Sequence, residues 1–138
     1  MYISRLLLIL LLILPGSAIA ELDIHNAWIK NLPPAVPVRA GYMTIRNTQT
    51  NALSIVAIRS DAFASVEIHR TIAEDGMMRM EAVPTLVIEP DATVQLAPGG
   101  LHLMMMNPAE PTKPGDVLQI VIEFDDGSTQ DLNMTVKK

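Results

Sequence analysis

Four side chains that suit a soft metal ion stand at a fixed spacing in this sequence of 138 residues: His69, Met80, His102 and Met104. Ten, twenty-one and one residues separate successive members, so the pattern is His-x10-Met-x21-His-x-Met. Imidazole and thioether groups are neutral ligands that match the soft, low-charge ion Cu(I), whereas zinc sites usually add thiolates or carboxylates and calcium sites need oxygen. The spacing therefore predicts a Cu(I) site.

The cysteine count narrows the chemistry further. The chain contains no cysteine, which excludes disulfides and thiolate metal sites. It also excludes a blue-copper electron carrier, because such a protein needs a Cys thiolate on the metal. Thioethers need no deprotonation and cannot be lost to disulfide formation, so they are practical copper ligands in an oxidising compartment.

The first twenty residues have the pattern of a secretory signal peptide. A short basic start at Arg5 precedes the apolar run Leu6 to Leu14, and Ala18-Ile19-Ala20 forms an A-x-A cleavage site. A membrane anchor is the alternative, but the nine apolar residues of the run are too few to span a bilayer, which needs about 20. We expect cleavage after Ala20 and export to the periplasm. No cysteine follows the run, so we expect no lipid anchor.

Residues 21–138 would remain after cleavage and predict a single compact domain. A chain of this size buries about two-thirds of its unfolded surface, which is enough for a hydrophobic core. All fifteen acidic residues and nine of the ten basic ones lie in this part, which gives a net charge near minus six. That charge argues against nucleic acid or anionic lipid as a partner and favours attraction of cations.

Short stretches of β-branched and apolar residues alternate with turn signals along residues 21–138, and none has a sustained helical period. The expected class is all-β, and about nine short strands suit a sandwich. We expect strands at Leu22 to Ile29, Ala40 to Asn47, Leu53 to Arg59, Val66 to Ile72, Met78 to Val83, Thr93 to Leu96, Leu101 to Met106, Val117 to Phe124 and Leu132 to Val136. An Asp-Asp-Gly-Ser turn between the last two predicts a hairpin.

A second predicted hairpin would bring His69 and Met80 together. Asp75-Gly76 is a strong signal for a two-residue type I′ turn. Counting outward from that turn pairs Glu74 with Met77, Thr71 with Met80 and His69 with Ala82. His69 and Met80 are then diagonal neighbours on one face, roughly 7 to 8 Å apart. A register shift of one residue would place them on opposite faces.

His102 and Met104 are two residues apart on one expected strand, so they share a face and lie about 6.7 Å apart. The residues that alternate with them are apolar: Leu101, Leu103 and Met105. We expect this apolar set in the core and the His-Met pair facing out from it. A lone His or Met in a β-protein is more often packed or solvated than a ligand, so the metal site depends on the convergence of both pairs.

The spacing and its surroundings resemble the periplasmic copper(I) chaperone family usually called PCu(A)C, over essentially all of residues 21–138. Besides the four ligands, the similar segments are Ala27-Trp28, Gly41 to Asn47, Val66 to His69, Gly76 to Met80, Pro98 to Gly100 and His102 to Met106. The resemblance implies a cupredoxin-like Greek-key β-sandwich that carries Cu(I) at an exposed site. It also implies delivery towards the CuA centre of cytochrome c oxidase, alone or with Sco-type proteins. His69, Met80, His102 and Met104 match the family's metal positions.

Other histidines and methionines rank below these four. Met78 is expected on the same strand face as Met80, and Met106 on the same face as Met104, so each is an alternative thioether donor. Met43 and Met134 are expected in the core, and His25 is expected as a surface or edge histidine. No Ser/His/Asp or paired-carboxylate arrangement is discernible in the sequence, so we predict no enzymatic activity.

Three functions are open at this point. The first is a metallochaperone that binds one Cu(I) and passes it by ligand exchange to a higher-affinity acceptor, which the resemblance identifies as the apo CuA subunit or a Sco-type protein. Neutral ligands suit exchange because each can be replaced without moving a proton. The second is a periplasmic copper-buffering or tolerance protein that uses the same site. The third is a metal-free interaction module whose Met-rich strand is a binding surface.

Overall fold

The computed structural model describes residues 21–138, so the expected signal peptide lies outside the described residues. This part of the chain forms ten strands and no helix, which confirms the all-β class. The strands are β1 Asp23–Lys30, β2 Val38–Arg46, β3 Leu53–Arg59, β4 Phe63–Glu74, β5 Met77–Ala82, β6 Leu86–Ile88, β7 Thr93–Leu96, β8 Leu101–Pro108, β9 Val117–Phe124 and β10 Thr129–Lys137. Over the same residues, no helix is long and apolar enough to cross a membrane.

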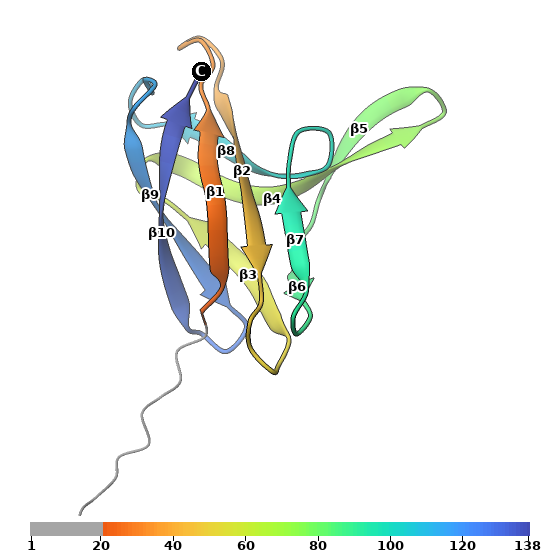
Figure 1. Ribbon diagram of the computed structural model, residues 1–138. Helices are drawn as coiled ribbons and strands as arrows, with labels where there is room; N and C mark the ends of the chain where they lie inside the picture. The colour runs from red at the N-terminus through yellow and green to blue at the C-terminus, as the bar shows by residue number, and fades with distance from the viewer. Residues whose placement is uncertain (1–20) are drawn as a thin grey trace, which may run out of the picture.

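The strands form one curved sheet that closes on itself. Hydrogen bonds join them in the order β5-β4-β8-β2-β1-β10-β9-β3-β6, and β7 pairs with β2. A further pairing between β3 and β4, at Ile58 and Val66, connects the two sides of this path. The result is a flattened, barrel-like sandwich, with β1, β2 and β10 on the side that faces the viewer in Figure 1.

Strand alternation builds the core between the two walls. In β9, Ile120, Ile122 and Phe124 point inward and are fully buried, and Leu103 and Met105 of β8 meet them from the other wall. Complete burial of a side chain of this size contributes about 1.5–3 kcal/mol relative to exposure. Met43 and Met134 are buried in the same core, as predicted. The wall that carries β8 is therefore held firmly from its inner face.

The sequence prediction missed β6. This strand pairs antiparallel with β3, and its first and last residues, Leu86 and Ile88, are buried while Val87 points to solvent. Three residues are too few to show a period in the sequence, and Pro84 and Pro90 on either side favour a loop. The strand forms because β3 offers a free edge on which those two side chains enter the core.

The hairpin of β4 and β5 has the predicted register. Asp75 and Gly76 have φ angles of 52° and 74°, and a type I′ turn requires positive values at both central positions. The pairs that follow are Glu74 with Met77, Thr71 with Met80 and His69 with Ala82. The outer part of this hairpin projects from the sandwich in Figure 1. We call this projecting segment, residues 69–82, the β4–β5 arm.

Candidate metal centre

Strands β4 and β8 bring the two histidines together. The strands pair antiparallel with His69 directly opposite His102, and the two ring centroids lie 6.1 Å apart. Met80 lies on β5, one strand further out, and Met104 lies two residues along β8 from His102. Met80, His102 and Met104 line one cavity of about 200 Å³. The structure thus gathers all four predicted residues on the outer face of the β4–β8 wall.

Each histidine uses one ring nitrogen in a hydrogen bond. His69 Nε2 lies 2.7 Å from a carboxylate oxygen of Glu67, and His102 Nδ1 lies 3.0 Å from the carbonyl oxygen of Gly100. Both partners are acceptors, so these two nitrogens carry the protons and donate them. In the neutral form of each ring, this leaves the lone pair on His69 Nδ1 and on His102 Nε2.

Those two lone-pair nitrogens are buried, and within residues 21–138 neither has a hydrogen-bond partner. A buried polar atom without a partner costs about 1–3 kcal/mol. Metal-binding histidines are typically oriented in this way, with the second ring nitrogen donating to a carboxylate or a backbone carbonyl. The geometry of His69 and His102 therefore fits a pair of metal ligands better than a pair of structural hydrogen-bonding residues.

Met80 is the most exposed of the four side chains. His102 is 6% exposed, the side chain of His69 is 13% exposed and Met80 is 56% exposed, while Met104 is partly buried. His102 points away from the core, as strand alternation predicted, but it is buried beside other residues that line the cavity, including Leu32 and Gly99. The Met80 thioether is therefore the donor that lies most towards solvent.

Aromatic residues cover the β2 side of the site. Tyr42 of β2 lines the cavity with His102 and Met104, and Trp28 of β1 packs on Tyr42 with ring centroids 4.9 Å apart. Burial raises the pKa of the Tyr42 phenol, so the group stays neutral at physiological pH and offers no phenolate ligand. Gly41 allows β2 to lie close to β8, because a Cβ atom there would stand 3.1 Å from Leu103 Cβ.

The surrounding donors do not suggest a harder metal ion. Across the described chain, no three His, Asp or Glu side chains lie together in a way that could hold a metal. The carboxylate of Glu67 is engaged with His69. Two neutral nitrogens and two neutral sulfurs therefore form the available set, which suits Cu(I) better than Zn²⁺ or Ca²⁺.

The remaining candidates are His25, Met106 and Met78. His25 is mostly exposed and its Nε2 lies 3.0 Å from Asp23, as expected of a surface histidine. Met106 of β8 pairs with Val38 of β2. Met78 of β5 lies closer to the tip of the arm than Met80 does. Sequence reasoning did not identify Glu67 as a partner of the site. The signal was its position two residues before His69, which puts both side chains on the same face of one strand.

Removal of Glu67 is expected to weaken metal binding without removing a ligand. In Glu67→Ala the acceptor that holds the proton on His69 Nε2 is lost, and loss of such a partner typically costs about 10–100-fold in metal affinity. Nitrogen NMR of the His69 ring should show one tautomer in the native protein and a mixture in the variant. Glu81→Ala, on the opposite face of the arm, is the matched control. An unchanged tautomer and affinity in Glu67→Ala would contradict this role.

The fold and the site together define a class: a small β-sandwich with a partly buried His/Met cluster suited to a soft metal ion. Residues 22–136 match the family described as putative lipoprotein LpqE-like, and the chain belongs to this family. It is 30% identical over 124 residues to a putative lipoprotein of Leifsonia xyli subsp. xyli, an alignment that covers 89% of this chain and 74% of that protein.

Solved structures show the same fold. The copper-bound PCuAC domain from PmoF2 has a TM-score of 0.72 at 18% identity, covering 87% of this chain and 95% of that one. The solution structure of CuI-DR1885 from Deinococcus radiodurans has a TM-score of 0.71 at 29% identity, covering 89% of this chain and 83% of that one. The resemblance to the PCu(A)C family and the cupredoxin-like sandwich predicted from the sequence are confirmed.

Proposed function

We propose that this protein is a periplasmic copper chaperone that binds one Cu(I) through His69, Met80, His102 and Met104. The main observation is the pair of buried ring nitrogens that have no hydrogen-bond partner among residues 21–138 and that lie on the same face of the sheet as two thioethers. One ion between the rings would satisfy both nitrogens at once. Two structural neighbours, a copper-bound PCuAC domain and CuI-DR1885, support copper as the bound metal.

Release of copper suits the distribution of the ligands. The histidines hold the ion from inside, whereas the more exposed Met80 can be displaced by a ligand of an acceptor protein. All four ligands are neutral, so exchange moves no proton and leaves the charge of Cu(I) unchanged. The acceptor we propose is the apo CuA subunit of cytochrome c oxidase, reached directly or through a Sco-type protein.

Transport of copper outside the cytoplasm requires export of the chain. The pattern of residues 1–20 predicts a leader cleaved after Ala20, and the relative from Leifsonia xyli is described as a putative lipoprotein. Both observations support an exported protein. The proposed role is carriage of a metal ion, with no chemical step performed on a substrate.

Mixing the Cu(I)-loaded protein with an apo CuA domain tests delivery. A chaperone should lose about one equivalent of copper to an acceptor that binds the ion more tightly. The two proteins are separated after mixing, and the copper content of each is measured.

A strain that lacks the gene for this protein provides the second part of the test. Under limiting copper it should lose oxidase activity, which added copper should restore. Retention of copper by the loaded protein, together with normal respiration of the deletion strain at low copper and sensitivity only at high copper, would instead identify a copper-buffering protein.

A further inference from the structure

The β4–β5 arm carries a row of soft donors that extends beyond the proposed site. One face of the arm consists of three successive cross-strand pairs: His69 with Ala82, Thr71 with Met80, and Ala73 with Met78. Each pair contributes one side chain able to bind a soft metal and one small side chain. We call this the donor face. Met78 is its outermost donor and is not one of the four ligands proposed above.

On the two strands of the arm, charged residues lie on the opposite face, and Asp75 lies in the turn. The pairs there are Arg70 with Glu81, Ile72 with Arg79, and Glu74 with Met77. Arg79 Nε donates to a carboxylate oxygen of Glu74 at 2.9 Å. The three pairs of the donor face therefore offer an approaching Cu(I) only neutral ligands. The carboxylate of Glu67, next along the same face of β4, is hydrogen-bonded to His69.

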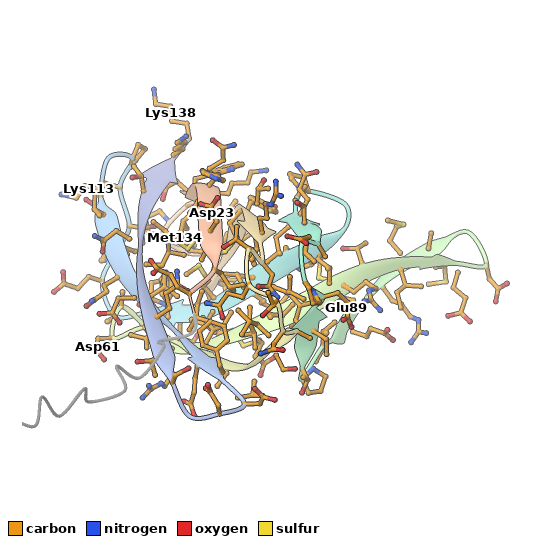
Figure 2. The ribbon with its side chains drawn as sticks, turned by 60° about the horizontal axis from the view of Figure 1, so that its bottom comes forward. Asp23, Asp61, Glu89, Lys113, Met134 and Lys138 are labelled. Atoms are coloured by element: carbon orange, nitrogen blue, oxygen red, sulfur yellow. The ribbon has the colours of Figure 1, made fainter. Side chains whose placement is uncertain are left out.

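Exposure of the donors rises along the donor face towards the tip. The side chain of His69 is 13% exposed, whereas Met80 is 56% and Met78 is 66% exposed. Figure 2 shows the side chains of the arm extending into space beyond the sandwich. Burial of a Met side chain contributes about 1.5–3 kcal/mol, a gain that Met78 largely forgoes. Packing does not explain a methionine at this position.

We propose that Met78 is an outer ligand that receives Cu(I) from, or gives it to, the four-ligand site. Residues 78 and 80 lie about 6.7 Å apart along one face of β5. Methionine is long and flexible, so both thioethers can reach one ion between them. The inference rests on the proposed copper function and adds a transfer position to it.

The transfer step is a simple ligand exchange. The thioether of Met78 forms a bond to Cu(I) as the first histidine nitrogen leaves, and the second histidine nitrogen and Met104 are then released in turn, so the ion passes from a mixed His/Met environment to the exposed Met78–Met80 thioether pair. The copper stays Cu(I), and no proton or electron moves. Because Met78 takes part in transit and not in the resting site, its loss should change rates of transfer much more than affinity at equilibrium.

Stopped-flow transfer of copper to bicinchoninate, a chromogenic Cu(I) chelator, tests the inference with Met78→Leu. Leucine keeps the size and apolar character of the side chain but removes the sulfur. We expect transfer to slow about tenfold, equivalent to about 1.4 kcal/mol on the barrier, while affinity measured by competition stays near the native value. Met77→Leu is the matched control, since Met77 is 73% exposed on the opposite face, and it should transfer copper at the native rate.

Three other results would contradict either this inference or the proposed function. Transfer at the native rate in Met78→Leu would overturn the inference and leave the chaperone proposal intact. A loss of affinity as large as that in Met80→Leu would make Met78 a resident ligand, which also overturns it. Failure of the native protein to bind Cu(I) would remove the proposed function first. Methyl NMR of labelled methionines gives a second readout, because the Met78 signal should broaden while copper exchanges with bicinchoninate and the Met77 signal should not.

Discussion

Replacement of both His102 and Met104 by Leu is expected to abolish Cu(I) binding while the fold is retained. The change removes one nitrogen and one sulfur donor, and the affinity should fall by more than the roughly 100-fold that loss of an outer-shell partner can cause. Copper content after anaerobic loading and gel filtration measures the loss. X-ray absorption of the native protein should show a shell of two nitrogen and two sulfur atoms.

Folding should survive because the two positions contribute little net stability without the metal. Leucine at position 102 removes a buried nitrogen that has no partner among residues 21–138 but also removes the hydrogen bond to Gly100. A typical hydrogen bond contributes about 0.5–1.5 kcal/mol, so the two effects nearly offset each other. Met106→Leu, on the same strand and face, is the control and should keep its copper. Retention of copper by the double variant would show that the ligand set is wrong.

Cu(I) is expected to stabilise the folded protein strongly, and Zn²⁺ is expected to do so weakly. The proposed ligands come from three strands, β4, β5 and β8, so they are brought together only in the folded state. A ligand that binds only the folded state adds about 4.1 kcal/mol when its free concentration is a thousand times its Kd. Anaerobic calorimetry with and without buffered Cu(I) measures this as a rise in Tm.

The selectivity of that stabilisation is the decisive comparison. Thioethers offer little to zinc, which binds chiefly through thiolate, imidazole and carboxylate ligands. The double Leu variant should show no rise in Tm with either metal, which separates binding at this site from nonspecific binding. An equal rise with Zn²⁺ and Cu(I), or no rise with Cu(I), would contradict the assignment of the site.

Local features of the sequence were enough to predict the β4–β5 arm and to predict which ligands share a strand face. The Asp75-Gly76 turn determines the register of β4 and β5, because a two-residue loop leaves the flanking strands only one favourable alignment. Alternation of side chains then decides that His69 and Met80 share a face, and likewise His102 and Met104. These relations involve residues close in the chain, and all of them are present in the structure.

Relations between distant segments were decided by the tertiary structure. His69 and His102 lie opposite each other because β4 pairs with β8, a choice of neighbour that strand periodicity does not contain. The coverage of His102 depends on residues brought in by β2 and by loops, such as Tyr42 and Gly99, and the short strand β6 depends on the free edge of β3. The face on which a side chain lies is determined by alternation within its own strand. Burial depends on the other segments that pack on that strand, so only the assembled sandwich buried His102 and left Met80 exposed.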